Sequence, residues 1–91
     1  MQCIIGLGNP GRKYAGTRHN IGFWVIEVLS QRHDLPLRKR KFHSDFAKGR
    51  LHGHEVILLK PTTHMNESGR AASAVARFYD LEPQQMLIVY D

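Results

Sequence analysis

A glycine-rich turn placed directly after an apolar run is the feature that most constrains this fold. The run Gln2–Leu7 has the length and apolar character of a short buried strand. The segment Gly6-Leu-Gly-Asn-Pro-Gly11 then predicts a sharp turn at the carboxyl end of that strand. Open α/β sheets bind ligands at this end of their strands, and Asn9, His19 and Asn20 follow there. We therefore predict that this segment forms a site and not part of the core.

Apolar spacing along the remaining chain predicts two helices and three further strands. The expected elements are a helix over about 21–33 with Asn20 as its N-cap, an extended segment from Phe42 to Lys48, a turn at Leu51–His54, a strand at Val56–Leu59, a helix over 66–79 and a strand at Met86–Tyr90. We expect the extended segment and the strand after it to form a hairpin. The resulting order βαββαβ predicts an α/β fold, with a mixed β-sheet flanked by helices in three layers, α/β/α.

Composition and charge bound the class of protein. With 91 residues the chain makes one domain at most, and its 42% of hydrophobic residues is ordinary for a globular protein. No apolar run approaches the ~18 residues that span a membrane, so we expect no membrane segment and a cytoplasmic location. The excess of 13 Lys and Arg over 8 Asp and Glu gives a net charge of +5, which favours an anionic partner. The single cysteine, Cys3, is expected to be an inert core residue of the first strand.

Three sequence blocks, in their order and separations, together resemble one known family. They are Gly6-Leu-Gly-Asn-Pro-Gly11 with Tyr14 and Thr17-Arg-His-Asn20, then Lys60-Pro-Thr-Thr-His-Met-Asn-Glu-Ser-Gly69, then Leu87-Ile-Val-Tyr-Asp91. In these blocks the chain resembles the bacterial-type peptidyl-tRNA hydrolases. Members of that family are about twice as long, so the resemblance covers their amino-terminal half only. We therefore expect residues 1–91 to form a single, incomplete domain of a truncated enzyme.

The resemblance implies a hydrolase of translation, which cleaves the ester between a peptide and the 3′ ribose of tRNA. It implies that His19 is the general base on water, that Asp91 orients it, and that Asn9 and Asn66 are further catalytic residues. Water is the expected nucleophile, because the motif Gly-x-Ser-x-Gly is absent and Cys3 lies in a strand. The expected partners are peptidyl-tRNA and free tRNA, bound by a monomer.

Further residues of these blocks are implied as substrate contacts, namely Tyr14, Met65 and Asn66. Each has a structural alternative: Tyr14 as a loop aromatic, Met65 as core, and Asn66 as the N-cap of its helix. His64 departs from the family, which usually has an aromatic residue there. No cofactor and no metal are expected, because His52-Gly-His54 lacks the converging ligands that zinc requires.

Two other functions stay open at this point. Gly6-x-Gly-x-x-Gly11 also matches the dinucleotide-binding fingerprint, although the helix should then open on the third glycine and Glu27 should end a strand instead of lying within a helix. Alternatively, the chain is an inactive or tRNA-binding fragment. Arg12, Lys13, Arg18 and the run Arg38–Lys41 would then bind phosphates, unless they form a solvated face.

Overall fold

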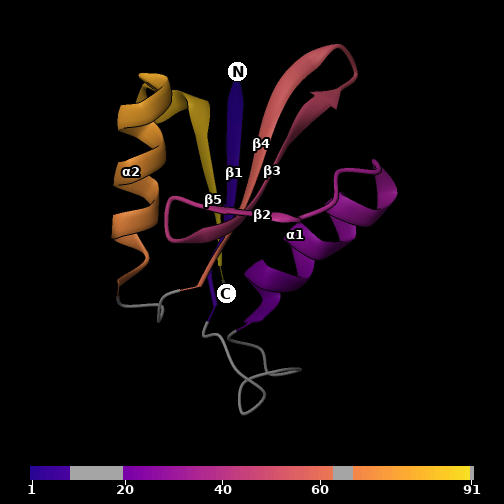
Figure 1. Cartoon of the computed structure of the whole chain (residues 1–91), viewed down its shortest axis with the longest axis horizontal. Coiled ribbons are helices and arrows are strands. Elements are labelled where there is room, and N and C mark those ends of the chain that lie inside the picture. The colour runs from indigo at the N-terminus through magenta and orange to yellow at the C-terminus, as the bar shows by residue number, and fades with distance from the viewer. Residues whose placement is uncertain (9–19, 63–66, 91) are drawn as a thin grey trace.

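The computed structural model describes residues 1–8, 20–62 and 67–90 of the chain (Figure 1). Its elements in chain order are β1 (Gln2–Gly6), α1 (Ile21–Arg32), β2 (Lys39–Lys41), β3 (Ser44–Leu51), β4 (His54–Pro61), α2 (Gly69–Tyr79), the 3₁₀ turn η4 (Pro83–Gln85) and β5 (Met86–Val89). Every predicted helix and strand is present, and β2 and η4 are additional.

The strands form one mixed sheet of five strands, in the order β2-β3-β4-β1-β5. β1 pairs in parallel with β4 on one side and with β5 on the other, so that Ile5 lies between Leu59 and Ile88. β3 pairs antiparallel with both β2 and β4. The predicted mixed sheet and its hairpin are therefore confirmed. Because β1, β4 and β5 run in the same direction, their last residues meet at one end, which we term the carboxyl end of the sheet.

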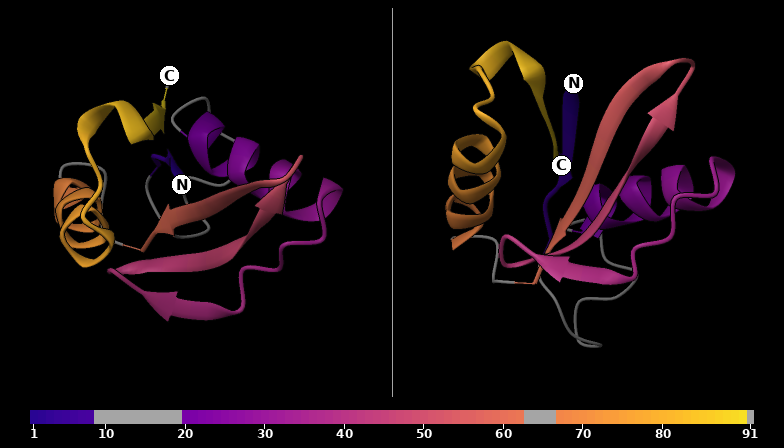
Figure 2. Two further views of the ribbon diagram at one scale, coloured as in Figure 1. Left: turned by 90° about the horizontal axis from the view of Figure 1, so that it is seen from above. Right: turned by 45° about the horizontal axis from the view of Figure 1, so that its top comes forward.

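One helix covers each face of the sheet (Figures 1 and 2). On one face, Val75 of α2 packs with Ile5 and Leu59 in a buried cluster. On the other face, Ile26 of α1 packs with Leu58. Successive residues of β4 thus belong to opposite cores, as the two-residue period of a strand requires. Burial on both faces explains why the central strands are continuous apolar runs, and it confirms the predicted three layers.

The short strand β2 is absent from the predicted order, so that prediction is corrected here. Its three residues are all exposed cations, which lack the apolar alternation that signals a strand. Pairing with β3 forms the strand, since Lys39 lies opposite Phe46. The two-residue turn Phe42–His43 joins the two strands with left-handed backbone angles, φ 57° and 54°, as tight hairpins require. Tertiary pairing, and not local pattern, therefore creates β2.

Helix α1 ends within one residue of its prediction, whereas α2 begins three residues later than predicted, at Gly69. Ser68 occupies the N-cap position of α2, and its carbonyl oxygen accepts hydrogen bonds from Ala71 N and Ala72 N at 3.1 and 3.2 Å. The alternative interpretation of Asn66 as the N-cap of this helix is therefore wrong, because Ser68 holds that position.

Strand β5 leaves apolar side chains accessible to solvent. Leu87, Ile88 and Tyr90 are 56%, 45% and 66% exposed. Within residues 1–8, 20–62 and 67–90, no strand pairs with the outer side of β5. The last part of the chain therefore combines a free sheet edge with an apolar surface.

The thiol of Cys3 is expected to be unreactive in the folded protein. Cys3 is fully buried in the core, and this desolvation raises the pKa of its thiol from 9.0 to about 12. We expect no reaction with a disulfide reagent at pH 8, but complete reaction in concentrated guanidinium chloride. The sign of the pH effect follows: the stability of the wild type relative to Cys3→Ala should fall as pH rises from about 9 toward 12, because the unfolded thiol ionises first. Rapid labelling under native conditions would contradict this burial.

Candidate active site

The six candidate site residues all lie outside the described residues. They are Asn9, Tyr14, His19, Met65, Asn66 and Asp91. The structure does describe the residues on either side of these segments. The first two segments are bounded by Gly8 with Asn20 and by Thr62 with Glu67, and Tyr90 precedes Asp91.

The carboxyl end of the sheet is the point from which all three segments leave the described fold. Gly8 follows β1, Thr62 follows β4, and Tyr90 follows β5. The backbone N–H of Leu7 donates a hydrogen bond of 2.9 Å to the carbonyl oxygen of Val89, which extends the pairing of β1 and β5 to this end. Figure 1 shows β1, β4 and β5 ending close together between α2 and the start of α1. Parallel strands therefore bring these three distant parts of the sequence to one place.

Helix α1 approaches this end of the sheet so closely that its first turn has no room for a side chain at Gly22. A Cβ atom there would lie 2.4 Å from Leu7 N, Leu7 O and Val89 O, which are all backbone atoms. A Cβ on Gly6 would similarly lie 2.1 Å from the carbonyl oxygen of Gly22. Two glycines thus let the helix backbone rest directly on β1 and β5, and this contact places Asn20 at the carboxyl end of the sheet.

Gly8 and Asn20, the residues that flank segment 9–19, lie against each other. A Cβ on Gly8 would lie 2.7 Å from Asn20 Oδ1 and 2.9 Å from Phe23 Cγ, so the Asn20 carboxamide covers Gly8. Asn20 occupies the predicted N-cap position of α1, but its side chain makes no capping hydrogen bond to the helix. Its carboxamide therefore packs against Gly8 and does not cap the helix.

Lys60, the last residue but one of β4, is a residue that the sequence analysis did not single out by itself. Its Nζ donates to Glu27 Oε1 at 2.8 Å and lies 5.3 Å from the centre of the Phe23 ring. Both charged side chains are partly exposed, so the pair contributes less than about 1 kcal/mol and serves to align β4 with α1. The only signal for Lys60 in the sequence was its place as the first residue of the family block Lys60–Gly69.

Thr62 is anchored on the opposite side by the β2–β3 turn. Its backbone N–H and its Oγ1–H both donate to the carbonyl oxygen of His43, at 2.8 and 3.0 Å. The chain is thus fixed immediately before segment 63–66. This second anchor was also not predicted, because the turn residues Phe42 and His43 carry no turn signature of their own.

The dinucleotide-binding alternative does not fit the described elements. The first described helix, α1, begins at Ile21 and not at Gly11, and Glu27 lies within that helix as predicted. Among the described residues, no three His, Cys, Asp or Glu side chains gather as a metal site, and no helix there is long and apolar enough to cross a bilayer.

Taken together, these elements define an α/β protein with an open sheet, a class of fold that binds ligands where its parallel strands end. The family model for peptidyl-tRNA hydrolase matches residues 3–91, and the chain belongs to this family.

Curated relatives agree with this assignment. A peptidyl-tRNA hydrolase from Exiguobacterium sp. is 44% identical over 91 residues, covering 100% of this chain and 49% of the relative. One from Alkalilimnicola ehrlichii is 48% identical over 92 residues, covering 100% and 47%. The chain therefore spans about half the length of the curated relatives it matches.

Solved structures share the fold. The crystal structure of peptidyl-tRNA hydrolase from Acinetobacter baumannii superposes with a TM-score of 0.94 at 43% identity, over 100% of this chain and 47% of that one. A complex of peptidyl-tRNA hydrolase with N-propanol gives the same values. This match covers every described element of the present chain.

Proposed function

We propose that this chain carries the site for hydrolysis of peptidyl-tRNA, in which the ester between the peptide and the 3′ ribose is cleaved to free tRNA and peptide. The observation that carries the proposal is that three segments with the family's motif residues leave the fold from one end of the sheet. Membership of the peptidyl-tRNA hydrolase family supports it.

In the proposed mechanism, His19 removes a proton from water as the water oxygen attacks the ester carbonyl carbon. Asp91 orients the imidazole and stabilises its charged form, as a carboxylate does in other hydrolases. The bond between carbonyl carbon and 3′ oxygen then breaks, and the imidazolium returns the proton to the leaving 3′ oxygen.

Neutral carboxamides suit the other two catalytic positions in this proposal. Asn9 and Asn66 donate N–H groups to the developing oxyanion or hold the attacking water, and their charge does not vary with pH. Tyr14, Met65 and again Asn66 contact the substrate. Support comes from the rigid anchoring of the flanking residues Gly8, Asn20 and Thr62, since a site works only when its groups are held in position.

The proposed setting follows from the substrate. We place the reaction in the cytoplasm, where peptidyl-tRNA forms during translation, and assign the enzyme as a monomer that uses no cofactor or metal.

The alternative is a chain that binds tRNA without turnover. One specific observation favours it: the net charge of +5 suits contact with the phosphates of tRNA.

The direct test is hydrolysis of an N-blocked aminoacyl-tRNA by the purified chain, followed as release of deacylated tRNA. Multiple turnovers, with an intact tRNA 3′ end as product, are the expected result. Binding of tRNA without release of the blocked amino acid would contradict the hydrolase proposal and favour the tRNA-binding alternative.

A further inference from the structure

The sheet has a second free side, at the strands farthest from β5. β2 pairs with β3 only from Lys39 opposite Phe46 to Lys41 opposite Ser44. The outer side of β3 from residue 47 to residue 51 therefore has no strand partner among residues 1–8, 20–62 and 67–90. The sheet therefore has a second unpaired edge along this part of β3.

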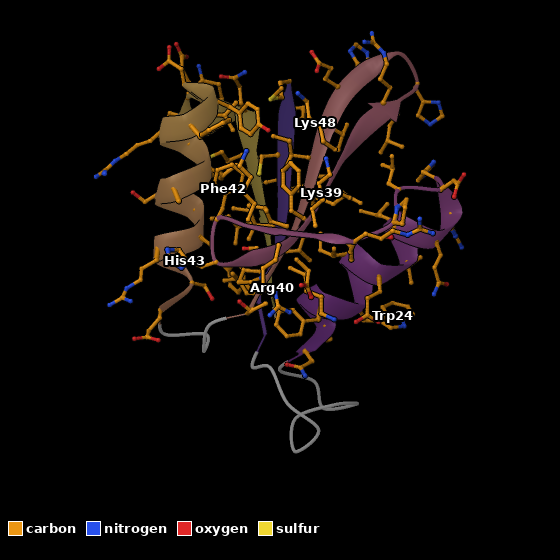
Figure 3. The ribbon with its side chains drawn as sticks, in the orientation of Figure 1. Trp24, Lys39, Arg40, Phe42, His43 and Lys48 are labelled. Carbon is orange, nitrogen blue, oxygen red and sulfur yellow. The ribbon has the colours of Figure 1, made fainter. Side chains whose placement is uncertain are left out.

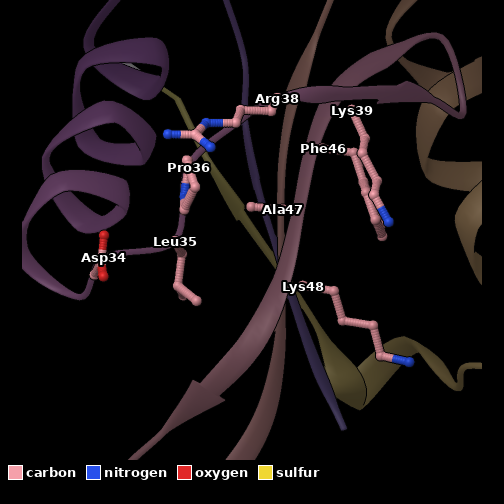
Figure 4. A pocket seen from close by; sticks show the side chains of 8 residues that line it. All are labelled: Asp34, Leu35, Pro36, Arg38, Lys39, Phe46, Ala47 and Lys48. Atoms are coloured by element: carbon pink, nitrogen blue, oxygen red, sulfur yellow. The ribbon is translucent and has the colours of Figure 1, made fainter.

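Three lysines gather on the face of this free side that α2 covers. Lys41 Nζ lies 4.0 Å from the centre of the Phe78 ring, and Lys48 Nζ lies 5.2 Å from that of Tyr79; both rings belong to α2. Lys39 is two residues from Lys41 and so shares its face. Figure 4 shows Lys39 and Lys48 pointing to the same side of β3, and Figure 3 shows both between the helices.

The positive charge on this face is largely uncompensated. Within the described part of the chain, neither Lys39 nor Lys41 has an ion pair, and Lys48 meets Glu55 only at 3.8 Å with both side chains half exposed. Arg40 differs, because it faces the α1 side and pairs with Asp45 at 3.2 Å. The lysine face is therefore the one available to an anion.

A hollow of about 270 Å³ opens beside these lysines, where β2 diverges from β3 (Figure 4). Its lining contains three cations, Arg38, Lys39 and Lys48, against one carboxylate, Asp34. The volume is below the roughly 300–1,000 Å³ of a small-molecule site. It suits one group of a longer anionic chain better than a whole small ligand.

An exposed aromatic ring adjoins the lysines. Phe78 is 61% exposed and is held by edge contacts with Phe42 and Tyr79, at 5.3 and 4.9 Å between ring centres. A rigid exposed ring beside cations is the usual platform for stacking of an unpaired base. It also distinguishes RNA from an acidic polypeptide, which has no base to stack.

We propose that Lys39, Lys41, Lys48 and Phe78, here termed the basic edge, bind the sugar-phosphate backbone and an unpaired base of RNA. The edge begins at the Phe42–His43 turn, and His43 accepts both hydrogen bonds from Thr62 at the carboxyl end of the sheet. The basic edge therefore begins beside Thr62, a residue that flanks the candidate active site. The choice of tRNA as that RNA rests on the proposed function.

The test is the salt dependence of tRNA binding by the full chain, measured by fluorescence anisotropy with labelled, deacylated tRNA between 50 and 200 mM KCl. Each lost phosphate contact lowers the slope of log K against log salt by about 0.7–0.9. We expect Lys39→Gln/Lys41→Gln to reduce this slope by roughly 1.4–1.8. The matched control, Arg32→Gln/Arg77→Gln, removes the same charge at two exposed helix residues outside the basic edge and should leave the slope unchanged.

A second variant tests the aromatic part. Phe78→Ala should weaken binding of a single-stranded RNA several-fold without altering the salt slope, because stacking releases no counterions. Equal salt slopes for both double variants would overturn the proposal. It would also be overturned if Lys39→Gln/Lys41→Gln lost binding to poly-glutamate, an acidic polypeptide, but bound tRNA as the wild type does. A chain that binds tRNA as expected but releases no product would contradict the proposed hydrolase function and still support the basic edge.

Discussion

Replacement of His19 by alanine is expected to lower the hydrolysis of N-blocked aminoacyl-tRNA by about 10²- to 10⁴-fold, the usual contribution of a general base. Without the imidazole, the attacking water keeps its proton and remains a weak nucleophile. The loss should appear in kcat and should leave tRNA affinity nearly unchanged, because His19 acts on the water. Release of deacylated tRNA at saturating substrate measures the first quantity, and anisotropy measures the second.

His54→Ala is the matched control for this prediction. His54 is exposed at the first residue of β4, at the opposite end of the sheet from the residues that flank the candidate site. Its removal tests for any general effect of losing a histidine, and full activity is expected. Undiminished ester cleavage by the His19→Ala protein would refute the assignment, as would an equal loss in both variants.

Replacement of Gly22 by alanine is expected to destabilise the fold by at least about 1–3 kcal/mol, the common cost of forcing atoms into a packed region. The new Cβ would lie 2.4 Å from Leu7 N, Leu7 O and Val89 O. No rotamer change relieves contacts with backbone atoms, so α1 must move away from the carboxyl end of the sheet. Urea unfolding followed by circular dichroism measures the free energy of unfolding.

Gly69→Ala provides the control, because no atom lies within 4 Å of a Cβ built on Gly69. Since alanine favours a helix over glycine by about 1 kcal/mol, this variant of α2 should be as stable as the wild type or more so. If Gly22→Ala unfolded at the wild-type urea concentration, the close approach of α1 to β1 and β5 would be disproved.

Local pattern predicted most of the fold. The apolar runs of β1 and β4 and the spacing of α1 reflect burial, which acts on each residue according to its place in the repeat. The turn at His52 and Gly53 was also predictable, because its backbone requires left-handed angles, φ 51° and 83°, which glycine favours. These features depend on neighbours in sequence and could therefore be read from it.

Contacts between distant residues were not predictable in this way. Lys60 and Glu27 are 33 residues apart, and Thr62 is 19 residues from His43, yet these pairs anchor the chain beside the candidate site. No single-sequence pattern records such a pair, since each partner is an ordinary polar residue alone. For the same reason β2 was missed, because a run of cations forms a strand only when a neighbouring strand supplies its partners.

The candidate site also combines features that the sequence indicates with features that depend on contacts between distant residues. The identities of Asn9, His19, Asn66 and Asp91 come from sequence motifs, and their catalytic roles stay predictions that the variants above test. The amino-acid sequence alone determined the family and the order of every helix and strand except β2, and it supplied the residues proposed for the chemistry, because motif and periodicity are local properties. Only the tertiary structure decided that β1, β4 and β5 end together, that Gly22 seats α1 upon them, and that the lysines of β2 and β3 lie beside Phe78. The sequence could not show these features, because strand pairing and close packing join residues that are far apart in the chain.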